Sequence, residues 1–368
     1  MPTASLADPS DNLVSAAGLR VLQVMAGAGV GGIETFFFDA VEALAEAGLA
    51  QFVVIRPGVP AHQIERLKRL GIPFATASFN KSWPWSTRRV FRKVRAQFKP
   101  NLAQFWTGRA AHFAQRDSGC RNIGWFGGYR QMKDFTSCDD FIGITPDLMR
   151  HLHEGGADPA RTARIHTFSA LPASEPVAVA RASLDTPDGV PLLLILARLH
   201  WKKGIDTLLA ALCDVPGAYL WIAGEGEERA QYEGLMKSLG LENRVRFLGW
   251  RDDRAGLLAA ADICVMPSRY EPFGTVMAEA WSAGVPLIVA AAQGPLAYVK
   301  DGENGLMVPI DDAPALADTI RRVTADPDLR ARIVAGGHRT YDTAFTKAAY
   351  VRGTLSFYRG VLNRVRGT

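Results

Sequence analysis

Two glutamates eight positions apart have the spacing in this chain that most clearly suggests chemistry. Glu271 and Glu279 lie in the run EPFGTVMAEA, where Pro and Gly predict a turn and the following residues predict a helix. A helix N-terminus carries unpaired N–H groups and partial positive charge, so it attracts phosphate. One carboxylate before that helix and one in its first turns could bind hydroxyls on either side of the phosphate. The pattern suits a sugar nucleotide, with one acid for the sugar and one for the ribose.

A basic loop lies upstream of this pair. Arg198 and Lys203 belong to the segment RLHWKKG, which follows a predicted strand at 192–197. Loops at the carboxyl ends of parallel strands form the ligand sites of open α/β sheets. Arginine can bind a diphosphate bidentately, and lysine acts as a point charge. Taken alone, the segment could equally be a solvated basic loop.

Short apolar runs alternate with helical patterns throughout, which predicts a parallel sheet in each half of the chain. The expected strands are 20–25, 52–56, 74–76, 102–105, 122–125 and 141–144 in the first half, and 192–197, 219–223, 245–248, 263–266 and 287–290 in the second. A long helix is expected over 347–365.

Length and composition indicate a folded chain of two domains without a membrane span. The chain has 368 residues, 48% hydrophobic content and a net charge of +5. Its four cysteines are scattered, which argues against structural zinc and suits a reducing cytoplasm. The first residues lack the basic start and apolar stretch of a signal peptide. The longest apolar run is too short to cross a bilayer.

Further motifs follow the basic loop in a set order. They are Gly224-Glu225-Gly226, Phe247-Leu248-Gly249-Trp250, Pro267-Ser268, Gly284-Val285-Pro286 and Asn304-Gly305. Together with Arg198, Lys203 and the Glu271–Glu279 run, this order resembles the retaining family 4 glycosyltransferases of GT-B fold. The resemblance implies an α/β protein with two Rossmann-like, doubly wound domains that face each other across a cleft.

The resemblance also implies an activity. The enzyme would move a hexose-type sugar from a nucleotide-diphosphate sugar, with UDP or GDP as carrier, to a hydroxyl of a glycan or glycolipid acceptor. Retention of configuration, independence of metal and cofactor, and a role in lipopolysaccharide or envelope polysaccharide biosynthesis are expected. The protein would be cytoplasmic.

The resemblance assigns roles residue by residue. Glu271, Arg198 and Lys203 are the expected catalytic residues. The expected donor-binding residues are Gly31, Gly32, Gly224, Trp250, Phe273, Gly274, Thr275, Val276 and Glu279. The expected domains are a tail at 1–18, an acceptor domain at 19–172, a linker at 173–190, a nucleotide-sugar domain at 191–345 and a helix at 346–368 that crosses back to the first domain.

A glycine pattern in the first half leaves other functions open. Residues 27–32 (GAGVGG) match the GxGxxG dinucleotide fingerprint. The second strand ends at Arg56 rather than at the acid that binds a ribose, although Arg56 would suit a 2′-phosphate. An NADP-binding oxidoreductase is therefore one alternative, and a non-catalytic nucleotide-sugar-binding protein is another.

Candidates for the acceptor side lie at further strand ends in the first half. They are Trp106, Arg109, Tyr129 and Arg130. Many family members carry a His near the sugar, and this chain has none at the corresponding place.

A basic segment at 81–99 contains seven Lys or Arg residues and no acid, with Trp83 and Trp85 at its start. Its apolar positions 90, 91, 94 and 98 share one helical face, which predicts a core-facing stripe. The surrounding cations could contact an anionic membrane surface or an anionic acceptor. A solvated face is the alternative, and no nucleic-acid module accompanies the charge.

Three aspartate pairs could suggest a metal site. They are Asp139-Asp140, Asp252-Asp253 and the Asp326-Pro327-Asp328 run. The third pattern is more typical of a helix start. Because Arg198 and Lys203 can neutralise the diphosphate, we expect no metal.

Overall fold

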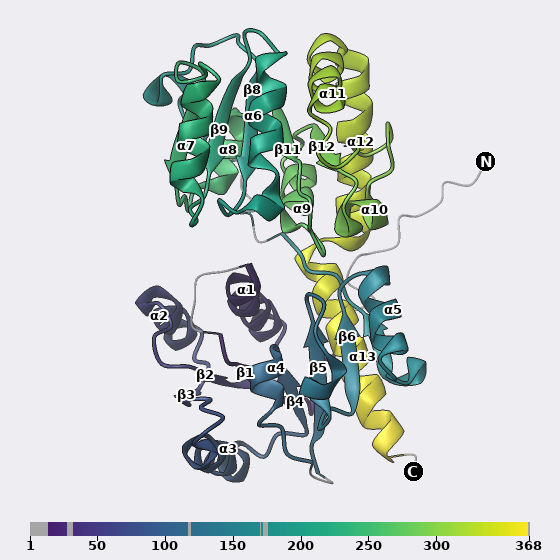
Figure 1. Ribbon diagram of the computed structural model, residues 1–368. Helices are drawn as coiled ribbons and strands as arrows, with labels where there is room; N and C mark the ends of the chain where they lie inside the picture. Colours follow the sequence, from purple (N-terminus) through teal and green to yellow (C-terminus); the bar gives the residue numbers. More distant parts are fainter. Residues whose placement is uncertain (1–13, 28–31, 117–118, 170, 172–175, 367–368) are drawn as a thin grey trace, which may run out of the picture. The chain divides into compact units, whose positions relative to one another are not determined.

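The computed structural model describes residues 14–27, 32–116, 119–169, 171 and 176–366. The chain divides into two compact units, which we call the N-terminal unit (residues 1–167 and 347–368) and the C-terminal unit (residues 168–346). Each unit is an α/β sandwich around a parallel sheet (Figure 1).

The described part of the N-terminal unit contains a seven-stranded parallel sheet in the order β3-β2-β1-β4-β5-β6-β7. Its strands are β1 (Arg20–Met25), β2 (Ala50–Ile55), β3 (Phe74–Thr76), β4 (Leu102–Phe105), β5 (Arg121–Phe126), β6 (Asp140–Gly143) and β7 (Thr162–Arg164). Its helices are α1 (Gly32–Glu46), α2 (Ala61–Arg69), α3 (Pro84–Phe98), α4 (Gly108–Ala111), η2 (Met132–Phe135), α5 (Pro146–Glu154), η3 (Pro159–Arg161) and α13 (Lys347–Arg366).

The described part of the C-terminal unit contains a six-stranded parallel sheet in the order β10-β9-β8-β11-β12-β13. Its strands are β8 (Leu192–Leu196), β9 (Tyr219–Ala223), β10 (Val245–Gly249), β11 (Ile263–Met266), β12 (Leu287–Ala290) and β13 (Leu306–Val308). Its helices are η4 (Arg181–Leu184), η5 (Trp201–Lys203), α6 (Ile205–Cys213), α7 (Arg229–Ser238), α8 (Arg254–Ala260), α9 (Thr275–Ser282), α10 (Gln293–Tyr298), α11 (Ala313–Ala325) and α12 (Pro327–Ala344).

Counted within each unit, both sheets begin with the doubly wound order 3-2-1-4-5-6. This confirms the predicted pair of Rossmann-like domains. Every predicted strand is present, with ends within two residues of the expected ones. The sequence patterns did not predict β7, because this edge strand is three residues of Thr, Ala and Arg without an apolar run.

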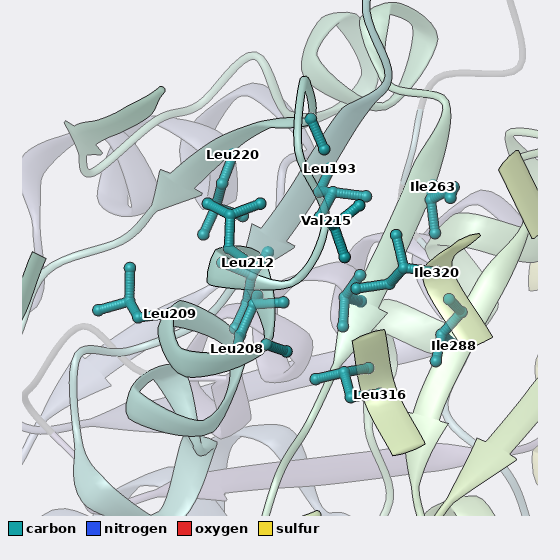
Figure 2. Close-up of a cluster of buried hydrophobic side chains, with 14 of the residues drawn as sticks. Leu193, Leu208, Leu209, Leu212, Val215, Leu220, Ile263, Ile288, Leu316 and Ile320 are labelled. Carbon is teal, nitrogen blue, oxygen red and sulfur yellow. The ribbon is translucent and has the colours of Figure 1, made fainter. Parts of the chain in front are cut away.

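The packing of the C-terminal unit explains why its strands are continuous apolar runs in the sequence. Strand β8 is buried at all five positions, because helices cover both faces of the sheet. Figure 2 shows α6 and α11 packing onto this sheet through branched aliphatic side chains. The side chains labelled there are Leu193, Leu208, Leu209, Leu212, Val215, Leu220, Ile263, Ile288, Leu316 and Ile320.

A chain of buried polar side chains crosses the sheet of the N-terminal unit. Gln23 Nε2 donates to Gln51 Oε1 at 3.1 Å, and the Trp106 indole N–H donates to Gln23 Oε1 at 2.9 Å. The Tyr358 hydroxyl of α13 donates to Gln104 Oε1 at 2.6 Å. Burial raises the pKa of Tyr358 well above its usual value, so this hydroxyl stays protonated and remains a donor. Buried polar groups require such partners.

Helix α13 is held against the N-terminal unit by charge as well as by this bond (Figure 1, yellow). Asp140 is fully buried, and it accepts from Arg364 at 2.8 Å and from Arg121 at 3.2 Å. The ring of Tyr350 packs edge-on against Phe36 of α1 at 5.4 Å. Asp140 therefore serves as an anchor of α13. None of the described helices has the length and apolar content that a bilayer-spanning segment requires.

Replacing Tyr358 by Phe should lower the free energy of unfolding by about 1–3 kcal/mol, because the acceptor Gln104 Oε1 would lose its buried donor. Urea denaturation followed by circular dichroism measures this loss. Tyr341→Phe is the matched control, since no residue in the described part of the chain hydrogen bonds to that hydroxyl, and its stability should stay within error. Equal stability of Tyr358→Phe and wild type would show that the bond contributes nothing.

Candidate active site

Two of the predicted catalytic residues, 68 positions apart in sequence, meet in the C-terminal unit. Lys203 ends η5 after β8, and Glu271 lies in the loop after β11. The Lys203 Nζ atom is 2.5 Å from Glu271 Oε2, and the two side chains are 24% and 13% exposed. Strands β8 and β11 are neighbours where the strand order reverses, which is the place where doubly wound sheets bind ligands.

At Gly204 these two loops pack too closely to leave room for a side chain. Gly204 has a φ of 64°, and a Cβ there would lie 2.1 Å from the Pro267 carbonyl oxygen. The Arg269 N–H donates to the Lys202 carbonyl at 2.8 Å, and the Arg269 guanidinium pairs with Asp206 at 2.7 Å. These contacts place Lys203 and Glu271 on adjoining loops, because each loop supports the other.

Arg198, the third predicted catalytic residue, lies two residues after the end of β8. Its side chain is exposed, and no residue within the described ranges forms a hydrogen bond or ion pair with it. The next residue, Leu199, is buried and donates its N–H to the Glu225 carbonyl at 3.0 Å. The loop is therefore anchored while the guanidinium remains available to an anion.

The packing around residue 224 requires a glycine. It has a φ of 148°, and a Cβ there would lie 1.9 Å from the Ala197 carbonyl oxygen. The loop after β9 thus packs on the loop that carries Arg198. A contact between Gly224 and a donor remains a prediction.

The N-terminus of α9 carries the predicted phosphate-binding group. Gly274 has a φ of 87° and begins the helix, and no side chain caps it. The N–H groups at Thr275 and Val276 are therefore not claimed by a capping side chain and can face an anion. The Glu271 carbonyl accepts the Gly294 N–H at 2.7 Å, which braces this turn against α10.

Phe273, a predicted donor-binding residue, is 5% exposed. Its ring packs against Tyr298 at 5.7 Å and Phe345 at 5.8 Å. The side chain therefore belongs to the core, which leaves the backbone of Phe273 as its possible contribution to a donor site.

Glu279 is 1% exposed on α9 and forms an ion pair with Arg254, the first residue of α8. A buried carboxylate is stable only with such a partner. The sequence patterns did not identify Arg254, although one acid within the apolar helix 275–282 was a signal that a cation must lie nearby. Burial, and then the charge of Glu279, raise the pKa of the Cys264 thiol to about 12, so this cysteine is not a nucleophile at neutral pH.

Trp250 follows β10 and is 57% exposed. Its indole N–H donates to Asp252 Oδ1 at 3.1 Å. The side chain is therefore not packed in the core, and a contact between this region and a nucleotide base stays a prediction.

The aspartates that could have suggested a metal site have other partners. Asp326 caps α12 by accepting the Leu329 N–H at 2.9 Å, as expected for a helix start. Asp253 pairs with Arg251. In the part of the chain that the structure describes, no three His, Cys, Asp or Glu side chains converge as metal ligands.

The glycine pattern at 27–32 lies only partly within the residues that the structure describes. Gly31 and the rest of 28–31 lie outside the described residues, and Gly32 is the exposed first residue of α1. A Cβ at Gly27 would lie 2.3 Å from Glu34 Oε1, so the carboxylate of α1 covers the end of β1. The donor contacts predicted for Gly31 and Gly32 stay predictions.

The four acceptor-side candidates differ in their surroundings. Trp106 is 1% exposed and packs at a tilt against Trp125, with 4.8 Å between the ring centroids, so its side chain belongs to the core. The Tyr129 hydroxyl donates to Asp147 at the start of α5. Arg109 and Arg130 are exposed. These two arginines are the candidates that present charge at the surface.

Known proteins resemble this chain in sequence and fold. A family model described as Glycosyl transferases group 1 matches residues 178–340. The lipopolysaccharide core biosynthesis glycosyltransferase LpsE of Rhizobium meliloti (strain 1021) is 36% identical over 324 residues, which cover 87% of this chain and 93% of LpsE. LpsD of the same strain, with the same description, is 35% identical over 340 residues, which cover 91% of this chain and 97% of LpsD.

A solved structure agrees with the topology of the two sheets. HepE from Anabaena, in complex with UDP and glucose, has a TM-score of 0.77 at 19% identity and covers 95% of this chain and 100% of its own. At that identity the likeness concerns the fold alone. Similarity to LpsE and LpsD extends through both units. The chain therefore belongs to the group 1 glycosyl transferases and is a family 4-like glycosyltransferase of GT-B fold.

Proposed function

We propose that this glycosyltransferase moves a hexose from a nucleoside-diphosphate sugar to a hydroxyl of the growing lipopolysaccharide core. The names of LpsE and LpsD support this acceptor class, because both relatives are described as lipopolysaccharide core biosynthesis enzymes. The complex of HepE with UDP and glucose supports a nucleotide-sugar donor. UDP and GDP are the carriers that we propose.

The observation that carries the proposal is the contact between Lys203 and Glu271 at the switch point of the second sheet, with the exposed Arg198 on the same loop as Lys203. A cation and a carboxylate in contact suit a donor with an anionic diphosphate and a neutral sugar. Lys203 would turn part of its charge toward the phosphate, and Glu271 would accept hydrogen bonds from sugar hydroxyls. Their pairing holds both groups ready before the donor arrives.

Transfer breaks the bond between the sugar C1 and the diphosphate oxygen, whose electron pair leaves with the diphosphate. Arg198, Lys203 and the N-terminus of α9 would stabilise this developing charge, and stabilisation of this kind usually contributes most to the rate enhancement of an enzyme. The acceptor oxygen would attack C1 from the face that the diphosphate leaves. A phosphate oxygen would take its proton, and the sugar configuration would be retained without a metal ion.

Glu279 would act on the ribose, in a way that its buried pairing with Arg254 constrains. One oxygen of the carboxylate faces the Arg254 guanidinium, so the side chain is held in a single orientation. The pair would orient the nucleoside, whereas Glu271 would orient the sugar. Neither glutamate needs to transfer a proton in this mechanism.

The alternative functions have less support. An NADP-binding oxidoreductase would rest on residues 27–32, most of which lie outside the described part of the chain. A non-catalytic nucleotide-sugar-binding protein has less support because the relatives LpsE and LpsD are both described as glycosyltransferases. The basic segment at 81–99 would bind an anionic group, either the cytoplasmic face of a membrane or an anionic acceptor.

Lys203→Ala and Glu271→Ala should each reduce sugar transfer by about a hundredfold or more, because each removes a preorganised charge at the reacting groups. Release of nucleoside diphosphate in the presence of acceptor measures the rate. Lys202→Ala is the matched control, since that ammonium lies 4.9 Å from the Tyr270 ring centroid rather than beside Glu271. Near-normal rates in both test variants, with unchanged melting temperatures, would contradict the proposed mechanism.

A UDP- or GDP-hexose should raise the melting temperature of the wild-type protein by several degrees at saturating concentration, because it binds only the folded state. NADP and NADPH should leave the melting temperature unchanged. Arg198→Gln should reduce the shift, since it removes a cation that faces the diphosphate. Stabilisation by NADPH alone would favour the oxidoreductase and overturn the donor class proposed here.

The anomeric configuration of the donor should persist in the product, and EDTA should leave the rate unchanged. Nuclear magnetic resonance of the purified product gives the configuration through its anomeric proton coupling. Product of the opposite configuration would refute retention. Loss of activity in EDTA that returns with Mg²⁺ or Mn²⁺ would refute metal independence.

A further inference from the structure

A basic cavity of about 600 Å³ lies on the N-terminal unit, and none of its lining residues is among those proposed to bind the donor. It is lined by side chains from α3 and from the segment that follows α4. The lining residues are Trp85, Arg88, Arg92, Arg95, Gln115 and Arg116. We call it the arginine cavity. Its volume lies within the range of small-molecule sites, which is roughly 300–1,000 Å³.

The α3 residues of the arginine cavity form one stripe along the helix. Trp85, Arg88, Arg92 and Arg95 are separated by three, four and three positions, so they share a face. The neighbouring face of α3 is buried through Thr87, Phe91 and Val94. Burial of that face fixes the rotation of the helix, and the cavity stripe is therefore held in position by the core.

All four cations in the cavity lining are arginines, whereas the lysines of the same segment, Lys81, Lys93 and Lys99, do not line it. This difference points to a ligand with a phosphoryl group. The guanidinium binds phosphate oxygens bidentately, whereas an ammonium acts as a point charge. General attraction to an anionic surface would not distinguish the two residue types, because each contributes about equally there.

Two of the arginines are positioned by backbone carbonyls. Arg95 donates to the Gln115 carbonyl at 3.0 Å, and Arg116 donates to the Thr136 carbonyl at 2.8 Å. Arg88 and Arg92 are exposed, and none of the residues that the structure describes pairs with either one through a hydrogen bond or an ion pair. The cavity therefore combines two arginines that backbone carbonyls hold in place with two whose guanidinium groups can bind an anion.

Trp85 provides an apolar wall beside these charges. Its side chain is 66% exposed, and the Arg88 guanidinium lies 5.8 Å from its ring centroid. An indole face at the side of a small cavity suits the apolar C–H face of a sugar ring, because both surfaces are flat and only weakly hydrated. Phosphate on that sugar would then reach the guanidinium groups.

We propose that the arginine cavity binds a phosphorylated sugar, with the phosphate on Arg88 and Arg92 and the ring against Trp85. The hollow shape and the arginine selection favour this discrete ligand over a flat lipid surface. The proposal concerns binding in the N-terminal unit only. It does not depend on the donor chemistry of Lys203 and Glu271.

The test is titration of the full-length protein with glucose 6-phosphate by isothermal calorimetry at low ionic strength. Arg88→Gln/Arg92→Gln should weaken binding by about tenfold or more, because two charge-assisted hydrogen-bond donors are lost. Arg89→Gln/Lys93→Gln is the matched control: it removes the same charge from exposed positions of α3 that do not line the cavity. This control should bind like wild type.

Two further variants separate the role of the sugar ring from that of the phosphate, and this cavity from the donor site. Trp85→Ala should weaken glucose 6-phosphate binding but not inorganic phosphate binding, because only the sugar needs the indole. Lys203→Ala should bind glucose 6-phosphate like wild type, even though its transfer activity is lost. The binding result is therefore separate from the test of the proposed function.

Two outcomes would overturn the proposal. One is equal weakening by both double variants, which would show that diffuse charge on α3 is responsible. The other is absence of saturable glucose 6-phosphate binding together with cosedimentation on phosphatidylglycerol vesicles that Arg88→Gln/Arg92→Gln abolishes. That second result would assign these arginines to the membrane surface.

Discussion

Close packing of two loops at the centre of the second sheet is the constraint on which the active site depends. Gly204 lies so near Pro267 that a side chain could not be accommodated, and the Arg269 N–H bonds to Lys202 across the same junction. Because β8 and β11 are neighbours in the sheet, these loops emerge side by side. The ion pair of Lys203 and Glu271 follows from that junction, since neither side chain could reach the other from separate edges.

Charge in this protein is arranged by pairing each buried ion with a specific partner. Glu279 is paired with Arg254 on the preceding helix of the unit, and Asp140 is paired with Arg121 and Arg364. These partners compensate the carboxylates in places where an unpaired charge would be strongly unfavourable. In contrast, Arg198 and the cavity arginines Arg88 and Arg92 remain exposed. Exposed cations of this kind are suited to bind anions.

Much of the fold could be predicted from the sequence, because parallel strands covered on both faces must be apolar along their whole length. Runs such as 192–196 and 263–266 are therefore visible without any structure. The edge strand at 162–164 could not be predicted in this way, because it is only partly covered and therefore carries no apolar run. Residue type alone could not place Trp106 and Phe273, because an aromatic side chain at a strand end suits a ligand site and a core equally well. The structure buries both side chains.

By itself, the sequence determined the strand positions, the helix starts after Gly274 and Asp326 and the set of charged residues available for donor chemistry, because these depend on local periodicity and spacing. Tertiary structure decided which of them meet. It paired Lys203 with Glu271 and Glu279 with Arg254, turned Trp106 into the core, and gathered Arg88, Arg92 and Arg116 around one cavity. Such contacts join residues far apart along the chain, and only the packing of helices on sheets sets their distances.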